Sequence, residues 1–297
     1  NVIEASGSSS AATLTLTGSL SANRAGTYAA TLGGTSAGVN VYAGTIGDGS
    51  ATSVAIVKDG STTWALTGAN TYSGVTTITS GTLKVGNGGT TGSLGSGGVT
   101  NSARLVFDRT NSLTVANAIS GTGTLEQAGA GITSLTAANS YSGPTLVSSG
   151  TLSMGNGGGT GSLGSGTVSI NAGATLAVNR SDSLAIGTTF GGAGRVLKQG
   201  SNTLTLTGSS GHTGGTSLSG GTLVVGSDAA LGTGTLSFAA NGVTLSSTRS
   251  LAVPIDVATT ATLAAGSNPI TLSGKLTGGG TLTKTGTGTL TLSGTGS

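Results

Sequence analysis

The chain has 297 residues, of which 58 are glycine and only 6% are charged, with a formal net charge of +3 and no cysteine. The singly scattered charges offer no basic surface for nucleic acid, and the missing cysteines exclude disulfides and thiolate metal sites. Because disorder normally pairs low hydrophobicity with high net charge, and 35% of these residues are hydrophobic, we expect an ordered fold.

The first residues, NVIEASGSSS, show neither the basic nor the apolar region of a signal peptide. No apolar run approaches the roughly 18 residues that a membrane helix needs, so no membrane span is expected. If the protein is exported, we expect this chain to be a mature or excised piece.

Short runs of alternating apolar and polar residues occur along the whole chain. They read TLTLT at 13–17, VTTIT from Val75, TLKV from Thr82, RLVF from Arg104 and TLTLT again at 203–207. Alternation over four to six residues between Gly, Asn and Ser is typical of short, half-buried strands. We expect Gly and Asn to supply positive φ where the backbone turns.

The strands belong to a repeat of about seventy residues. SGTLKVGNGGTTGSLGSG from Ser80 and SGTLSMGNGGGTGSLGSG from Ser149 agree at 15 of 18 positions, and a looser copy starts at Gly220. Many short strands at a fixed period indicate a solenoid, in which each coil buries its apolar face against the next. The sequence therefore predicts an all-β, parallel β-helix of roughly a dozen coils.

The predicted core of this solenoid consists of inward aliphatic residues that stack from coil to coil. The inward positions include Leu204, Leu206, Leu218, Leu223 and Val225. Trp64 stands in register with Leu204 and Leu290, so we expect its ring to pack inward and its indole N–H to need a partner.

A second repeated segment, called the companion phrase here, precedes the Gly-rich segment. The three copies read VKDGSTTWALTG, LKQGSNTLTLTG and TKTGTGTLTLSG. Lys58, Lys198 and Lys284 thus hold the same position in the phrase, whereas the copy around Gln127 departs from it. We divide one continuous solenoid accordingly into N-terminal coils with a weak repeat match, three repeat units and the start of a fourth: residues 1–57, 58–131, 132–197, 198–283 and 284–297.

The order K-x-G-x-x-x-L-x-L-x-G, then Tyr-Ser-Gly, then G-T-L-x-V-G resembles the passenger-associated transport repeat, also called the autotransporter-associated β-strand repeat. The resemblance covers Lys58–Gly86, Ile132–Gly155, Lys198–Gly226 and the start of a copy at Lys284–Gly294. It implies a right-handed β-helix that is secreted or displayed on a bacterial surface as the stalk of an autotransporter passenger, and an extracellular or cell-surface location. The membrane barrel that completes such proteins has no counterpart here, which predicts an internal fragment or a different use of the repeat.

The eight acids are the candidates for catalytic chemistry, because parallel β-helices also include pectin lyases and glycosidases. Asp108–Arg109 and Arg180–Asp182 fall at matching places in successive repeats, with Arg249 near the third. A lyase would use them as an acid and base cluster. Since the pattern recurs with the repeat, we interpret it as a ladder of solvated outward side chains.

The remaining candidates favour scaffold roles. His212, the single histidine, stands where other copies have Tyr72 and Tyr141, and one histidine cannot form a usual zinc site. The Gly-rich loops lack the aspartates of calcium-binding nonapeptides. We therefore predict no catalytic, cofactor-binding or metal-binding residue, and no cofactor.

The sequence thus predicts a non-enzymatic stalk or fibre segment that supports display, adhesion or matrix formation. The alternative is a polysaccharide-binding or polysaccharide-cleaving β-helix. The expected partners are a second copy of the chain, joined end to end through unpaired strand edges, and a host or matrix surface. Nucleic acid is not among them.

Overall fold

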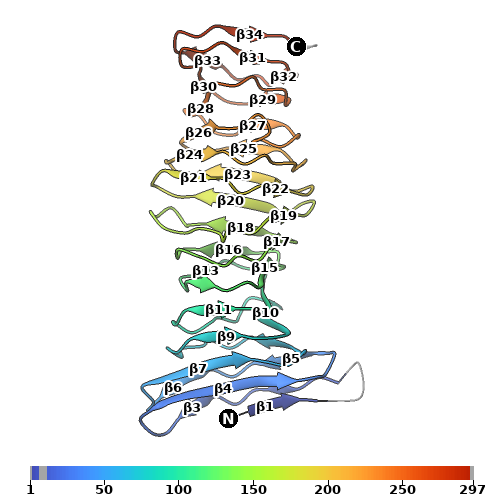
Figure 1. The fold of residues 1–297 in the computed structure, drawn as a ribbon, viewed down its shortest axis with the longest axis vertical. Coiled ribbons are helices and arrows are strands. Elements are labelled where there is room, and N and C mark those ends of the chain that lie inside the picture. Colours follow the sequence, from blue (N-terminus) through green and yellow to red (C-terminus); the bar gives the residue numbers. More distant parts are fainter. Residues whose placement is uncertain (1, 7–11, 295–297) are drawn as a thin grey trace. The chain divides into compact units, whose positions relative to one another are not determined.

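Short parallel strands stack coil upon coil throughout the described chain, as Figure 1 shows for each part. The computed structural model describes residues 2–6 and 12–294, so residues 1, 7–11 and 295–297 of the predicted first and last segments lie outside it. The fold is an all-β, parallel β-solenoid of about 13 turns, which confirms the predicted class; its right-handed sense stays a prediction.

The chain has two compact units, Asn1–Gly150 with Ser162–Gly166, and Thr151–Gly161 with Thr167–Ser297. The first unit stacks three faces. One face contains β1 (Val2–Ala5), β4 (Thr27–Gly34), β7 (Ser53–Lys58), β9 (Thr76–Ile78), β11 (Val99–Asn101) and β14 (Ile119–Ser120). The next contains β2 (Thr15–Leu16), β5 (Val39–Tyr42), β8 (Thr63–Leu66), β10 (Thr82–Gly89), β12 (Arg104–Arg109), β15 (Thr124–Gln127) and β17 (Thr145–Val147). Two short pairs complete it, β3 (Leu20–Ala22) with β6 (Ile46–Gly49) and β13 (Leu113–Val115) with β16 (Ile132–Leu135).

The second unit is built in the same way. Its longest face contains β18 (Thr151–Met154), β20 (Thr175–Asn179), β23 (Arg195–Gln199), β25 (Thr216–Leu218), β27 (Leu236–Phe238), β29 (Ile255–Val257) and β32 (Leu276–Thr277). Another contains β21 (Leu184–Ile186), β24 (Thr203–Leu206), β26 (Thr222–Val225), β28 (Val243–Ser247), β30 (Ala261–Ala264) and β33 (Leu282–Thr285). The pairs β19 (Val168–Ile170) with β22 (Phe190–Gly191) and β31 (Ile270–Leu272) with β34 (Leu290–Leu292) complete it.

Register brings like residues above one another. Leu83 pairs with Leu105, which pairs with Leu125, and Leu204 pairs with Leu223. The predicted inward residues Leu204, Leu206, Leu218, Leu223 and Val225 are all buried. Trp64 is also fully buried, and its indole N–H donates to the Gly33 carbonyl at 3.0 Å, as predicted. The aliphatic stack removes apolar surface from water continuously, which stabilises each coil at about 25 cal/mol per Å² buried.

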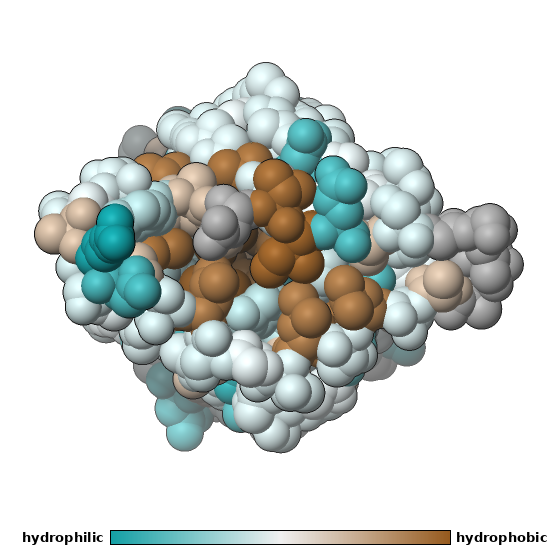
Figure 2. Space-filling model, turned by 90° about the horizontal axis from the view of Figure 1, so that it is seen from below, coloured by the Kyte–Doolittle hydropathy of each residue, from teal (hydrophilic) through white to brown (hydrophobic). Residues whose placement is uncertain are grey.

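The N-terminal coils differ from the rest. Val2 pairs with Thr31 and Tyr28 with Val54, so these coils are several residues longer than the later ones, and this length explains the weak repeat match. Their inward residues Ile3, Leu14 and Leu20 are only half-buried. Figure 2 views this end of the first unit and shows apolar side chains uncovered in the middle of a polar rim.

Turns use glycine more strictly than expected. In the described chain all residues with positive φ are glycines, so the expectation that asparagine shares this role is wrong. At the corners, the asparagines act through side-chain hydrogen bonds to neighbouring coils and not through a left-handed backbone. Asn70 Oδ1 accepts from the Ile46 N–H at 2.8 Å, and its Nδ2 donates to the Ser93 carbonyl at 2.7 Å, so one side chain ties three coils together.

Candidate functional site

The lysine of each repeat lies inside the solenoid. Lys58, at the end of β7, and Lys198, in β23, are both fully buried. Lys58 Nζ donates to the carbonyls of Asp59 at 2.7 Å, Gly60 at 2.8 Å and Ser80 at 3.2 Å, of which the last lies on the following coil. The three donors of the ammonium therefore meet three acceptors. We call this arrangement the lysine cage.

Lys198 repeats this geometry in the second unit. Its Nζ donates to Gln199 at 2.5 Å, Gly200 at 2.9 Å and, one coil later, Gly220 at 3.0 Å. Burial lowers the pKa of both lysines to about 8, because an ammonium loses hydration inside the protein. For Lys58, the charge of Asp59 opposes part of this shift.

The two other copies depart from the cage. Gln127 is fully buried at the same place and donates to Gly129 at 2.7 Å and Gly131 at 3.3 Å, but its Oε1 has no partner among the described residues. Lys284 is half-buried and donates to Gly286 at 2.8 Å. The cage escaped sequence reasoning, although Lys58 has the inward parity of Ile56 and Lys198 that of Val196.

The aromatic position of the repeat is a second buried polar site. Tyr72 and Tyr141 each share a 2.7 Å hydrogen bond with a threonine four residues later, Thr76 or Thr145. His212 replaces the tyrosine as predicted, and its Nε2 lies 3.0 Å from Thr216 Oγ1. His212 Nδ1 is buried without a partner in the described part of the chain, and burial lowers the pKa of this imidazole.

The repeated arginines hold the Gly-rich loops. Arg180 is 9% exposed and donates to the carbonyls of Gly161 at 2.5 Å and Gly159 at 2.9 Å. Arg109 is half-buried and donates likewise to Gly92 at 2.7 Å and Thr90 at 2.6 Å. The interpretation as solvated side chains is therefore wrong for Arg180, whereas the Arg249 side chain is 43% exposed and pairs with Asp228 at 2.8 Å. A guanidinium has a fork of donors, and it reaches from one coil onto the loop of the coil before.

The two candidate acids, Asp108 and Asp182, have separate partners. Asp108 pairs with Lys84 at 2.6 Å, and Asp182 pairs with Arg180 at 2.6 Å. The hydrogen bond from Arg180 holds the pKa of the Asp182 carboxyl below its usual value. Among the described residues, no three His, Asp or Glu side chains gather where they could hold a metal ion.

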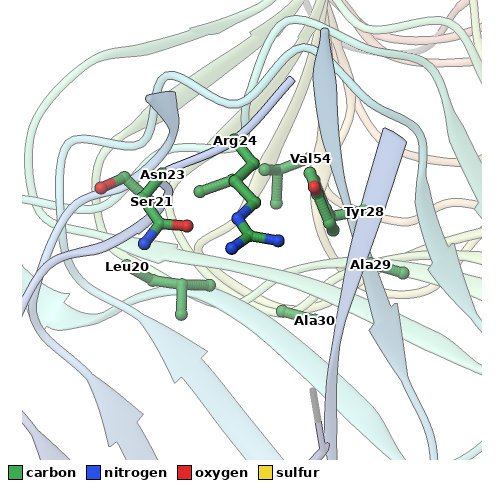
Figure 3. A pocket seen from close by; sticks show the side chains of 9 residues that line it. Leu20, Ser21, Asn23, Arg24, Tyr28, Ala29, Ala30 and Val54 are labelled. Carbon is green, nitrogen blue, oxygen red and sulfur yellow. The ribbon is translucent and has the colours of Figure 1, made fainter. Parts of the chain in front are cut away.

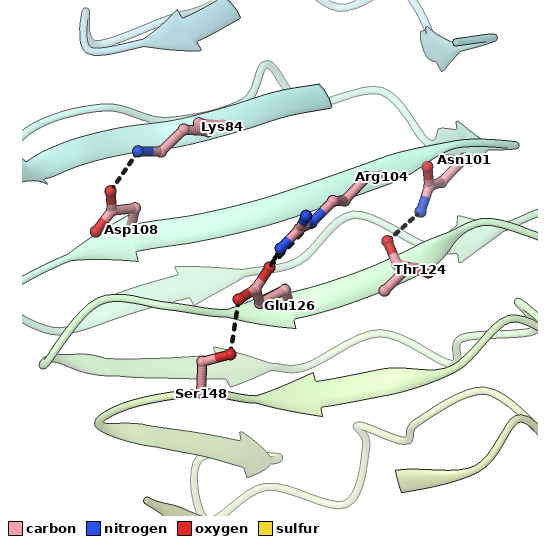
Figure 4. A network of polar contacts seen from close by, with 7 residues as sticks. All are labelled: Lys84, Asn101, Arg104, Asp108, Thr124, Glu126 and Ser148. Atoms are coloured by element: carbon pink, nitrogen blue, oxygen red, sulfur yellow. Dashed lines mark hydrogen bonds and ion pairs between the residues drawn. The ribbon is translucent and has the colours of Figure 1, made fainter. Parts of the chain in front are cut away.

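A polar ladder crosses β10, β12 and β15 of the first unit and ends at Ser148, which directly follows β17 (Figure 4). Lys84 on β10 pairs with Asp108 on β12, and Arg104 pairs with Glu126, whose other oxygen accepts from Ser148 at 2.6 Å. Neighbouring strands thus carry charges of opposite sign. The ladder neutralises itself, so it offers no pair of free carboxylates for acid–base chemistry.

One concave surface lies among the N-terminal coils (Figure 3). It has a volume of about 440 Å³, and the polar and aromatic side chains that line it are Ser21, Asn23, Arg24 and Tyr28. Tyr28 is 41% exposed, and Figure 3 shows the Arg24 guanidinium directed across the pocket. An exposed ring beside guanidinium and amide donors has the chemistry to hold a polar ligand, including an acidic sugar.

No described helix has the length and apolarity that crossing a membrane requires.

The Passenger-associated-transport-repeat family matches residues 56–85, 125–154, 196–225 and 282–297. These matches contain both lysine cages and Gln127. The chain is also 46% identical over 101 residues to the protein named "Adhesin BmaC autotransporter" from Brucella suis biovar 1 (strain 1330). That similarity covers 34% of this chain and 3% of the adhesin.

No solved structure matches the chain. The family matches fall on the four places where the sequence shows the repeat, and the geometry explains why its Lys, Tyr and Gly positions recur. The chain is a parallel β-solenoid that carries four matches to the passenger-associated transport repeat, and about a third of it is similar to an autotransporter adhesin.

Proposed function

We propose that this chain is a non-enzymatic, structural β-solenoid segment of a secreted bacterial surface protein, with an extracellular or cell-surface location. One observation carries this proposal: the polar residues that recur with the repeat have their partners inside the scaffold. Lys58 and Lys198 bind turn carbonyls, and Arg109 and Arg180 bind Gly-rich loops. Residues with these partners hold the coils in a regular stack, as a stalk or fibre requires.

The relative with the name of an adhesin supports a role in display or adhesion. Antibody raised against this chain is expected to label intact cells of the source bacterium, and the purified chain is expected to bind host or matrix surfaces. Asp108→Asn and Asp182→Asn should leave that binding unchanged. Turnover of an acidic polysaccharide that disappears in Asp108→Asn would overturn the non-enzymatic assignment.

A second candidate function is polysaccharide binding, which the pocket around Tyr28 and Arg24 favours. Tyr28→Ala and Arg24→Ala should each weaken the binding of a polyuronate to the purified chain, measured by calorimetry. Lys275→Ala is a matched control, because Lys275 is exposed and lies in the other unit. If all three variants bind alike, the pocket is not the sugar site.

We also propose that solenoid ends associate with one another, since the uncovered apolar side chains of the first coil favour burial (Figure 2). Electron microscopy over a range of concentrations is expected to show end-to-end filaments. Isolated short particles at every concentration would contradict end-to-end association and leave the stalk proposal intact.

A further inference from the structure

Three Asn-Gly pairs are exposed on the solenoid: Asn87–Gly88, Asn156–Gly157 and Asn241–Gly242. In such a pair, the backbone nitrogen of the glycine can attack the side-chain carbonyl carbon of the asparagine, because glycine has no side chain to obstruct the approach. The attack requires a backbone N–H that is free to leave its hydrogen bond. The three pairs differ in the contacts around them.

In two of the pairs, the glycine N–H is held by a backbone hydrogen bond to the following coil. The Gly157 N–H donates to the Asn179 carbonyl at 2.8 Å, and the Gly242 N–H donates to the Thr260 carbonyl at 2.9 Å. The Asn241 side chain is also fixed, since its Oδ1 accepts from the Thr260 N–H at 3.0 Å. These bonds must break before either ring closure can begin.

The Asn87 pair lies where the sheet is interrupted. The register of β10 with β12 shifts between Val85 and Gly89, and no register pair of β10 in the described structure includes Asn87 or Gly88. Lys84 Nζ donates to Asn87 Oδ1 at 3.0 Å and is held by Asp108 at 2.6 Å. Figure 4 shows the Lys84–Asp108 pair. A cation therefore touches the oxygen on which negative charge develops during attack at Cγ.

We propose that Asn87 is a self-modifying site, at which Lys84 promotes conversion of the asparagine to aspartate and isoaspartate. The Gly88 nitrogen bonds to Asn87 Cγ and loses its proton to solvent. The Cγ–Nδ2 bond then breaks, and Nδ2 takes up a proton and leaves as ammonia. Water opens the resulting succinimide at either carbonyl carbon. The net reaction consumes one water and yields a carboxylate and an ammonium ion.

The repeat itself supplies a matched control. The loops around Asn87 and Asn156 come from segments that agree at 15 of 18 positions, but Ser153 stands in place of Lys84. Ser153 Oγ donates to the Gly155 carbonyl at 2.7 Å. Val85 pairs with Phe107 and Met154 with Val178, so Asn179 stands in place of Asp108. The second loop thus lacks both the cation and the acid that holds it.

The test uses the full purified chain, incubated for several weeks at neutral pH and body temperature. Peptide mass mapping follows the gain of about 1 Da at each asparagine, and isoaspartate is assayed separately. Asn87 is expected to convert at least about threefold faster than Asn156 or Asn241, since a half-buried cation in an ion pair gives a modest stabilisation. Equal conversion at Asn87 and Asn156 would overturn the proposal.

Lys84→Met should slow conversion at Asn87 and leave the rates at Asn156 and Asn241 unchanged. Lys84→Arg should retain faster conversion, because the positive charge remains. The two other sites also report folding, since a variant that unfolds would convert faster at all three sites. An unchanged rate at Asn87 in a folded Lys84→Met protein would exclude the role of Lys84.

Discussion

Replacement of a caged lysine by methionine tests whether the lysine cage stabilises the solenoid. Methionine has a similar length but no donor, so Lys58→Met leaves the carbonyls of Asp59, Gly60 and Ser80 without the ammonium. At about 1–2 kcal/mol for each unpaired buried group, the loss is about 3–6 kcal/mol. The substitution also removes the desolvation of an ammonium whose pKa is lowered from 10.5 to about 8, which offsets up to about 3 kcal/mol. We expect a net loss of about 2 kcal/mol.

The natural glutamine in the second copy extends this prediction to a series. Gln127 reaches two carbonyls and leaves its own Oε1 unpaired. Lys58→Gln should therefore lose about half as much stability as Lys58→Met, and Gln127→Lys should gain about 1 kcal/mol. Lys275→Met is the control, because exposed Lys275 should change stability by less than about 0.5 kcal/mol.

The assay combines urea unfolding, followed by circular dichroism, with hydrogen exchange. Solenoids can unfold coil by coil, so the exchange of the Thr79 N–H, which donates to the Lys58 carbonyl at 2.9 Å, reports the local effect. Thr79 should lose protection in Lys58→Met and keep it in Lys275→Met. If Lys58→Met matches or exceeds the wild type in both measurements, ammonium desolvation outweighs the three hydrogen bonds, and the reasoning is refuted.

Three further predictions concern pH and the aromatic position. The folded pKa of Lys58 and Lys198 is about 8 and the unfolded value is 10.5, so the unfolded chain binds more protons between these pH values. The free energy of unfolding should therefore rise from pH 8 to about pH 10. Urea midpoints that stay flat or fall over this range would contradict this prediction. Burial lowers the pKa of His212, so stability should fall as pH drops below 6.5, and His212→Tyr, which restores the residue of the other copies, should abolish this loss in thermal melts. A Cβ at Gly95 would sit against the Tyr72 carbonyl and 2.5 Å from ring atom Cδ2, so Gly95→Ala should cost more than about 2 kcal/mol, whereas Gly89→Ala, at an open position, should cost less than about 0.5 kcal/mol.

Alternation of side chains was sufficient to predict the strands and the core. Leu204 and Leu206 lie inward because a strand turns successive side chains to opposite faces, and Trp64 follows from the same parity. The class of fold followed from the repeat, since a coil that cannot bury its face alone must stack.

The polar interior could not be predicted in the same way. The acceptors of Lys58 include Ser80, which lies 22 residues later, and those of Arg180 include Gly159 on the preceding coil. These partners are set by the register between coils, which a linear reading does not supply. Lysine and arginine are also rarely buried without partners, so the sequence reading placed the repeated arginines on the surface and gave the lysines no buried role. The greater length of the N-terminal coils was missed for a related reason, because it shows only in the register between neighbouring strands, such as Val2 with Thr31 and Tyr28 with Val54.

The buried polar groups specify the register between coils, which the similarity of the repeats would otherwise leave ambiguous. Coils so alike in sequence could slip by one coil and still stack leucine on leucine, so the aliphatic core alone specifies register weakly. A slipped coil would leave Lys58 or Lys198 facing a turn without its three carbonyls, and an unpaired buried ammonium costs several kcal/mol. Each asparagine that spans three coils, such as Asn70, adds the same discrimination. The aliphatic residues therefore drive stacking, whereas the cages, arginines and asparagines make one register the stable one.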